Sequence, residues 1–320
     1  MIPTPLVFGV SVLIAVFLLW QRGDLGDVGA AARHADAATV ALALMLYLAG
    51  LALLSTRWHL LVRMTKGTSD VARASEAFLT SVVINYAAPV GLAVPTRAAL
   101  TKRALGLSAA ETGAIALWEV LLDVIVLGVI TLLWAITGRT AGGVLGEALA
   151  TMPTALVGLA ATGVVVLGVV LALALCRPGL RRRVALAGSG LLRFPRRRPL
   201  AATWALLASV VYWLGQGVVL WLLLEALDVD RGFALVLGLT GLPVLVGMLS
   251  PVPGGAGVRE ALMVAVAHGH EADGAAVLVA AVTYRIALFA AIPILYLAVR
   301  AWLVLRPANP GGDAPIPALD

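Results

Sequence analysis

Long apolar runs, separated by short polar segments, make up most of the chain. A helix needs about 20 predominantly apolar residues to cross a bilayer. Runs of this kind occupy residues 2–20, 37–56, 109–137, 151–176, 200–224 and 276–305. We therefore predict an all-α membrane protein with six full transmembrane helices.

Two further apolar stretches, residues 74–95 and 232–268, are interrupted by proline and glycine. Proline removes a backbone donor, and glycine tolerates conformations outside the helix, so both residue types permit a break. Irregular backbone at membrane depth is tolerated where protein or a wet cavity covers it. The predicted breaks fall at Pro89, Gly91, Pro251, Pro253, Gly254, Gly255 and Gly257.

Composition places almost the whole chain in the membrane. Of its 320 residues, 61% are hydrophobic and 12% are charged, whereas soluble domains carry about 25% charged residues. A soluble core could not bury so much apolar surface. We predict a single transmembrane domain over residues 1–305, followed by a disordered cytoplasmic tail at 306–320. The single cysteine, Cys176, excludes an intrachain disulfide.

Loop charge predicts orientation, because lysine and arginine concentrate in the cytoplasmic loops of membrane proteins. Residues 57–73 and 177–198 are rich in basic residues, whereas residues 225–231 and 268–274 are mostly acidic. We expect the basic segments to face the cytoplasm and the acidic segments to face outward. The net charge of +6 lies largely next to helix ends, so we expect no nucleic-acid partner.

The charges of the flanking segments also predict that the two interrupted stretches are re-entrant helical hairpins. Residues 74–95 lie between the basic segment 57–73 and a basic cluster at 97–103, so the chain returns to the side it left. Residues 232–268 lie between two acidic segments and return in the same way. With two hairpins and six spans, both termini are predicted to be cytoplasmic.

The two hairpins resemble each other in sequence, and their predicted orientations are opposite. Pro89 is followed eight residues later by Arg97, and Pro251 is followed at the same distance by Arg259. Inverted repeats with broken helices are the architecture of many secondary transporters, whose substrate sites lie between the repeats. The predicted copies span about residues 37–137 and 200–305.

Arg97 and Arg259 are candidate substrate-binding residues. Each would lie in the first turn of a half-helix, where free N–H groups and the helix dipole favour an anion and a guanidinium pairs with phosphate. Alternatively, each arginine reaches to its own membrane interface or caps a neighbouring helix. Asn85 precedes the first break and would line a cavity or bond the broken backbone.

Ionisable residues within the spans form a second candidate group. Glu119 and Asp123 are four residues apart, so they share one face near the middle of a long apolar helix. Charges at that depth are expensive and usually face a cavity or a partner. Arg285, in the corresponding helix of the second half, is the expected partner. Such a pair would be structural, or the carboxylates would exchange arginine partners during transport.

We expect neither a metal site nor a cofactor site. His268 and His270 lie beside Glu271 and Asp273, but on a short outward loop we interpret them as a solvated turn. The glycine-rich residues 254–257 lack the Lys-Ser/Thr of a phosphate-binding loop, and no strand precedes them.

A motif in the second half of the chain resembles the signature of a known family. Residues 250–260 read Ser-Pro-Val-Pro-Gly-Gly-Ala-Gly-Val-Arg-Glu, and Tyr284-Arg285 follow in the next helix. This pattern resembles the C-terminal signature of the lysylphosphatidylglycerol synthase transmembrane-region family, a group of flippase-like membrane proteins. Arg57-Trp58 also fits a frequent feature of that family near the end of the second span.

The earlier signature is degraded. Asn85, Pro89 and Arg97, with Glu119 and Asp123 further on, are similar to the family's N-terminal signature. In the family this hairpin usually reads Pro-x-Arg-x-Gly-Glu/Asp-x-x-Arg. This chain instead has Gly91, Ala93 and Val94 at the first arginine, the glycine and the acidic position. Because the basic and the acidic residue are absent together, neither charge is left without a partner. The identity of the substrate stays open.

The resemblance implies translocation of an amphipathic lipid, such as an aminoacylated phospholipid or a polyprenyl-linked glycan, across the bacterial cytoplasmic membrane. Aminoacylation would need an attached cytosolic synthase domain, and only a short tail follows Leu305. We therefore expect a transporter and not an enzyme, with membrane lipids and a possible enzyme as partners. Two alternatives stay open: a membrane glycosyltransferase or synthase accessory acting on lipid phosphates, and a scaffold that transports nothing.

Overall fold

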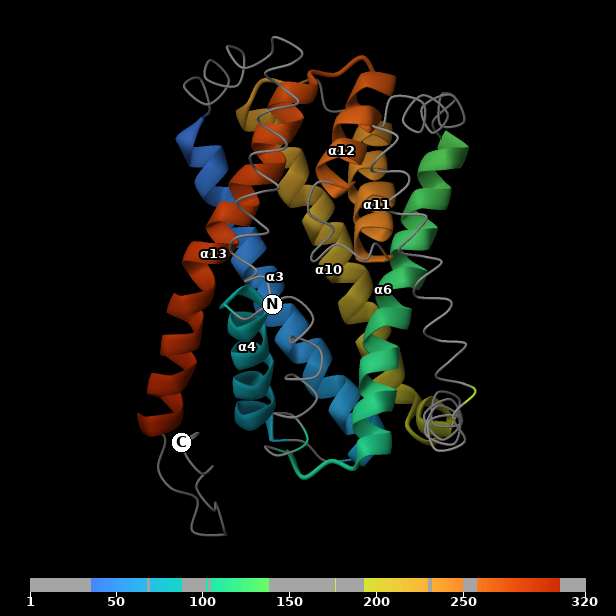
Figure 1. The fold of residues 1–320 in the computed structure, drawn as a ribbon, viewed down its shortest axis with the longest axis vertical. Helices are drawn as coiled ribbons and strands as arrows, with labels where there is room; N and C mark the ends of the chain where they lie inside the picture. The colour runs from blue at the N-terminus through green and yellow to red at the C-terminus, as the bar shows by residue number, and fades with distance from the viewer. Residues whose placement is uncertain are drawn as a thin grey trace.

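The computed structural model describes residues 36–67, 70–87, 102, 105–137, 176, 193–229, 232–249 and 258–305. Within these residues the regular secondary structure is helical throughout. For some helix residues, Asn85 and Arg285 among them, the structure describes the backbone alone. Figure 1 shows the described helices side by side in an elongated bundle.

Three of the described helices are long and apolar enough to cross a membrane: α3 (Ala37–Lys66), α6 (Ala109–Thr137) and α10 (Pro199–Ala226). They correspond to the spans predicted at 37–56, 109–137 and 200–224, and the helix predicted at 276–305 is α13 (Gly274–Leu305). The spans predicted at 2–20 and 151–176 lie outside the described residues, apart from the exposed Cys176.

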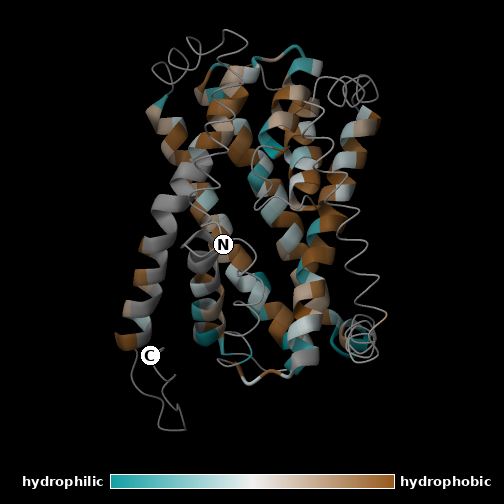
Figure 2. Ribbon diagram, viewed as in Figure 1, coloured by the Kyte–Doolittle hydropathy of each residue, from teal (hydrophilic) through white to brown (hydrophobic). Residues whose placement is uncertain are grey.

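The outward faces of the long helices are apolar, as a lipid environment requires. Soluble monomers rarely expose contiguous apolar patches larger than a few hundred Å². Figure 2 shows hydrophobic residues along much of the helices, with hydrophilic residues at the ends of the bundle and at some positions within it. The exposed large apolar side chains of α6 and α10 include Val120, Ile125, Val129, Leu132, Trp204, Leu207, Val211, Leu214 and Val218. The chain is a helical membrane protein.

Helix α3 runs past the predicted end of its span, so the loop predicted at 57–73 is wrong over its first ten residues. The helix begins after Asp36, whose carboxylate accepts hydrogen bonds from the backbone N–H and hydroxyl of Thr39. Those bonds hold the pKa of the Asp36 carboxyl below its ordinary value. The C-terminal cap of α3 is Gly67, whose backbone φ of 94° is a conformation that glycine adopts more readily than other residues.

Both ends of the antiparallel pair α3 and α10 are tied together. At one end the Asp36 N–H donates to the Ala226 carbonyl at 3.1 Å. At the other end the Arg198 guanidinium donates to the carbonyls of Met64 and Thr65 at 3.0 and 2.8 Å. Arg198 therefore closes the last turn of α3, a structural role in addition to its predicted place in a basic loop.

The start of α6 agrees with the prediction because its sequence carries a capping box. The Glu111 carboxylate accepts from the Ser108 N–H at 2.8 Å, and the Ser108 hydroxyl accepts from the Glu111 N–H at 3.2 Å. Two backbone donors that helix geometry would leave open are satisfied in this way.

The interrupted stretch at 232–268 forms two short helices, α11 (Phe233–Leu249) and α12 (Val258–Gly269), that pack against each other. In Figure 1 α11 starts at the end of the bundle where α10 finishes and runs toward the middle, and α12 returns to that same end. The predicted breaks at Pro251, Pro253, Gly254, Gly255 and Gly257 lie between them, outside the described residues.

The earlier interrupted stretch begins with α4 (Val71–Ala87). In Figure 1 α4 starts at the opposite end of the bundle from α11 and also stops near the middle. The predicted breaks at Pro89 and Gly91, and Arg97 beyond them, lie outside the described residues.

Contacts between the two halves of the chain are reciprocal. Helix α3 of the first half packs along α10 of the second, α4 packs against α13, and α6 packs against α11. The short helices α4 and α11 therefore each contact the long last helix of the other half. In Figure 1 α3 and α10 run in opposite directions, and so do α6 and α13.

Helices α6 and α11 approach closely because two glycines of α11 face α6. A Cβ added at Gly238 would lie 2.6 Å from Trp134 Nε1, and one added at Gly241 would lie 3.0 Å from the Thr131 backbone nitrogen. An added Cβ at either position would force atoms of α6 to shift, so the two glycines allow the close approach. Small residues at helix contacts are the usual means of close packing in membranes.

Candidate functional site

A buried ionic cluster lies where α3, α6 and α10 meet. Arg57 of α3 is 3% exposed, and Asp123 of α6 is 9% exposed. Both terminal nitrogens of the Arg57 guanidinium donate to the Asp123 carboxylate. Arg57 Nη2 also lies 3.7 Å from Glu119 Oε1. Glu119 and Asp123 thus share one helix face and one arginine, as their spacing of four predicted for the face.

Within the described residues, the cation of this cluster is Arg57. Arg285 was predicted to pair with the carboxylates, and its side chain lies outside the described residues, so that pairing stays a prediction. Arg57 was assigned to a loop because basic residues follow it closely. The Arg57-Trp58 feature of the family resemblance was the available signal that this arginine has a specific place.

The cluster extends into α10 through two polar side chains. The Ser209 hydroxyl accepts from Arg57 Nη1 at 3.1 Å and donates to the Ala205 carbonyl at the same distance. The Trp213 Nε1–H donates to Asp123 Oδ1 at 2.8 Å. Asp123 therefore holds the guanidinium and the indole together, which fixes the orientation of the Trp213 ring.

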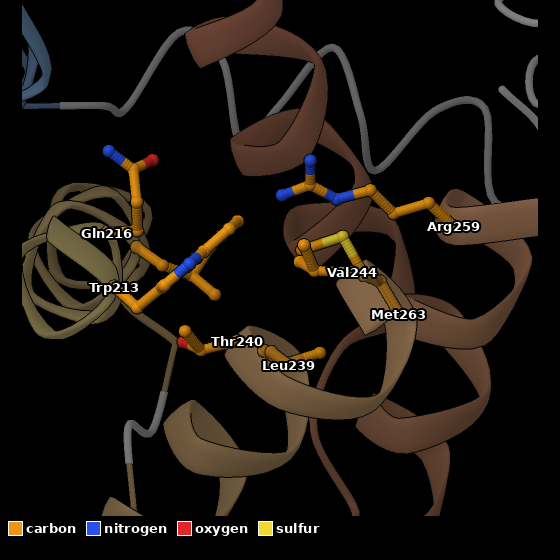
Figure 3. A pocket seen from close by; sticks show the side chains of 8 residues that line it. Trp213, Gln216, Leu239, Thr240, Val244, Arg259 and Met263 are labelled. Carbon is orange, nitrogen blue, oxygen red and sulfur yellow. The ribbon is translucent and has the colours of Figure 1, made fainter. Parts of the chain in front are cut away.

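Trp213 also forms a wall of a small pocket between α10, α11 and α12. Its volume is about 20 Å³, which is room for about one water molecule, and part of it is open to the surroundings. Figure 3 shows the Arg259 guanidinium reaching across from α12 toward Gln216 and Trp213 of α10. The lining residues are Trp213, Gln216, Leu220, Leu239, Thr240, Val244, Arg259 and Met263.

The polar groups of the pocket include a buried hydroxyl. Thr240 of α11 is 5% exposed, and among the residues that the structure describes its Oγ1 has no hydrogen-bond partner. The pocket therefore offers a cation, an amide and a hydroxyl within an otherwise apolar lining. A guanidinium and a hydroxyl of this kind can hydrogen-bond an anionic oxygen or a water molecule.

The pocket contains one of the six predicted substrate-binding residues, Arg259. Glu119 and Asp123 lie in the ionic cluster behind Trp213. Asn85 is in the last turn of α4 and Arg285 is in α13, with only their backbones described, and Arg97 lies outside the described residues. The prediction missed Trp213, Gln216 and Thr240, because single polar residues within apolar helices carry no motif.

The His268–Asp273 turn has a packing role on the described residues. No group of three or more His, Cys, Asp or Glu residues that could hold a metal ion occurs in the described ranges. His270 Nε2 accepts from Trp134 Nε1 at 3.1 Å, which joins the end of α6 to the turn between α12 and α13. Burial lowers the pKa of the His270 imidazole below its ordinary value.

Comparison with known proteins identifies the family. The family described as Lysylphosphatidylglycerol synthase TM region matches residues 6–295, which contain the ionic cluster and the pocket. No curated protein and no solved structure matches the chain. On the family match, which agrees with the signature around Arg259, the chain belongs to the lysylphosphatidylglycerol synthase TM region family.

Proposed function

We propose that this protein moves an amphipathic lipid with an anionic headgroup across the bacterial cytoplasmic membrane. The pocket between α10, α11 and α12 widens during transport to admit the headgroup, and the acyl or prenyl chains stay in lipid. The observation that carries this proposal is the position of Arg259, which lines a pocket between the long helix α10 and the short helices α11 and α12, in a bundle with apolar outer surfaces. A guanidinium there favours phosphate over neutral groups.

The arrangement of the helices supports a transport mechanism. We infer that the halves form an inverted repeat, in which α4 and the α11–α12 pair are re-entrant from opposite sides of the membrane. The reciprocal contacts α4 with α13 and α6 with α11 support this inference. In such repeats, rocking of one half against the other exposes a site near the midplane to each side in turn.

Charge supports an orientation for this mechanism. Arg63 and Lys66 end α3 beside Arg198, whereas Glu225 and Asp228 lie at the opposite end, where α10 finishes. By the positive-inside rule the basic end faces the cytoplasm. The pocket then lies in the half of the bundle that is nearer the outer side of the membrane. Both chain termini are proposed to be cytoplasmic.

Purified protein in sealed vesicles with headgroup-labelled lipids tests the proposal. Wild-type protein should accelerate movement of anionic lipids between leaflets, and Arg259→Gln should remove most of that acceleration. Arg63→Gln is the matched control, because Arg63 is an exposed arginine at the end of α3 and should leave the rate unchanged. No movement of any lipid by the wild type would contradict the proposal, and product formed from a lipid-phosphate donor would indicate an enzyme.

A further inference from the structure

We propose that the short helical turn at residues 193–197 and the start of α10 form a binding site for an anionic phospholipid of the cytoplasmic leaflet. Arg193, Arg196 and Arg197 hold the lipid phosphate, and Leu200 contacts the acyl chains. The site is separate from the pocket beside Arg259, and it does not depend on lipid movement across the membrane. Its place in the cytoplasmic leaflet uses the orientation proposed above.

The turn at residues 193–197 is fixed to the bundle by its inner face. Phe194 packs against the apolar cluster between α3, α4 and α6. Four residues later, and therefore on the same face, Arg198 donates to two carbonyls in the last turn of α3. Gly67 leaves room for this guanidinium, because a Cβ added there would collide with it. The position of the turn is therefore set by contacts of both inward residues.

The outer face of the turn carries the three arginines. Arg193, Arg196 and Arg197 occupy positions i, i+3 and i+4, so they share one helix face, and all three are exposed. The Arg198 N–H donates to the Phe194 carbonyl at 3.1 Å, which closes the helical turn beneath them. Among the residues that the structure describes, none of the three forms a salt bridge with a carboxylate.

The length of α10 places this turn at the membrane surface. At 1.5 Å per residue, the 28 residues of α10 span about 42 Å, whereas the hydrocarbon core of a bilayer is about 30 Å thick. A helix of this length reaches the headgroup region at its ends. In Figure 1 the turn lies beside the start of α10, at the end of the bundle where α3 finishes.

The surface next to the arginines is apolar, which favours a lipid over a soluble anion. Leu200 and Trp204 are one helical turn apart on the same face of α10, and they are 76% and 59% exposed. Leu207 and Val211 continue this exposed face toward the middle of the helix. Arginine binds phosphate through two parallel hydrogen bonds, and anionic leaflets attract basic segments beside membrane helices. A phosphate attached to acyl chains therefore fits both parts of the surface.

Quenching of tryptophan fluorescence tests the site, because Trp204 reports on lipid next to Leu200. The full-length protein is reconstituted into vesicles of phosphatidylcholine and phosphatidic acid, in which one of the two lipids carries brominated, quenching acyl chains. The difference between wild type and Trp204→Phe isolates the signal of Trp204. We expect phosphatidic acid to occupy the site about tenfold more readily than phosphatidylcholine. Arg193→Gln, Arg196→Gln and Arg197→Gln together should remove this preference, and each alone should lower it about twofold.

The matched control combines Arg63→Gln with Lys102→Gln. Both residues are exposed and basic, and they lie at the same end of the bundle as the turn. The control removes positive charge from the membrane surface and leaves the three arginines in place, so it should keep the preference. An equal loss of preference in the control would show that general surface charge attracts the lipid, and would overturn the inference.

Stability measurements separate binding from folding. The three arginines are exposed, so in detergent without anionic lipid the triple variant should unfold at the wild-type temperature. Added phosphatidic acid should raise the unfolding temperature of the wild type, because a ligand of the folded state stabilises it, and should not raise that of the triple variant. The three single variants give the same comparison with one charge removed at a time.

Inorganic phosphate at the same concentration distinguishes a lipid site from a site for free anions, and it should not displace the lipid. The inference would be contradicted by a wild type without preference for phosphatidic acid, by a preference that persists in the triple variant, or by displacement of the lipid by inorganic phosphate.

Discussion

Arg57 shows how a single charged residue can be fixed within a membrane helix. Removing a guanidinium from water is costly, and the cost is recovered only when its donors find well-placed acceptors. Here Asp123 accepts from both terminal nitrogens, and Ser209 accepts a further bond. The cluster thus depends on every member being present.

Removing Arg57 should therefore destabilise the protein strongly. Arg57→Met leaves the buried Asp123 carboxylate and the half-buried Glu119 carboxylate without their cation, and we expect a loss of about 3–5 kcal/mol in the free energy of unfolding. Reversible unfolding in detergent measures it. Combined with Asp123→Asn, the double variant should lose less than the sum of the single losses. Additive losses would show that the two residues do not act as a pair.

His270 should make stability depend on pH near neutrality. Its pKa is lowered in the folded protein, so between that value and its unfolded pKa of about 6.5 the unfolded state binds more protons. Stability is therefore full above about 6.5 and falls as pH drops through the folded pKa, when the imidazole can no longer accept from Trp134.

The measurement is the difference in unfolding temperature between wild type and His270→Gln from pH 8 to pH 5. Glutamine keeps an acceptor and does not titrate, so the wild type should lose more stability on acidification. A constant difference across that range would contradict the assignment.

At the scale of elements, the sequence predicts the end of a helix well where the residues that cap it lie next to it in the chain. The start of α6 follows from the Ser108–Glu111 capping box, whose two partners lie within four residues of each other. The end of α3 was missed because Arg57, Arg63 and Lys66 indicate a loop by hydropathy. The carboxylate that stabilises Arg57 within the helix lies 66 residues away, and no local pattern shows it.

The pocket could not be predicted for the same reason. Arg259 stands out beside a Pro/Gly break, but Trp213, Gln216 and Thr240 are single polar residues in apolar helices. They become a site only when α10 and α11 pack against each other.

Because α6 packs closely against α11, we expect a substitution at Gly241 to destabilise the protein. Gly241→Ala places a Cβ about 3.0 Å from backbone of α6, and backbone cannot move aside as a flexible side chain can. We expect a loss of about 1–3 kcal/mol in the free energy of unfolding.

Gly128→Ala is the matched control, since a Cβ there meets nothing within 4 Å. Alanine should be neutral there, or should stabilise the helix by up to about 1 kcal/mol. Equal effects of the two substitutions would contradict the close approach of α6 and α11.

At the scale of the whole molecule, the ionic cluster and the pocket join the two halves. Arg57 and Asp123 belong to the first half, Ser209 and Trp213 to the second, and Trp213 takes part in both sites. A movement of one half against the other would have to shift this tryptophan or break its bond with Asp123. Trp213→Phe, which keeps a ring and loses the donor, should therefore slow lipid movement more than Trp204→Phe on the outer face of α10.

The most direct test of transport by alternating access is chemical labelling of the pocket from each side of the membrane. Replacing Cys176 removes the single cysteine, and Met263→Cys then places one thiol in the pocket. Val71→Cys and Phe233→Cys, exposed at opposite ends of the bundle, define the two sides. Alternating access predicts that an impermeant thiol reagent labels Met263→Cys from either side, whereas each control reacts from one side only. Labelling of Met263→Cys from a single side under all conditions, with or without lipid, would contradict the account.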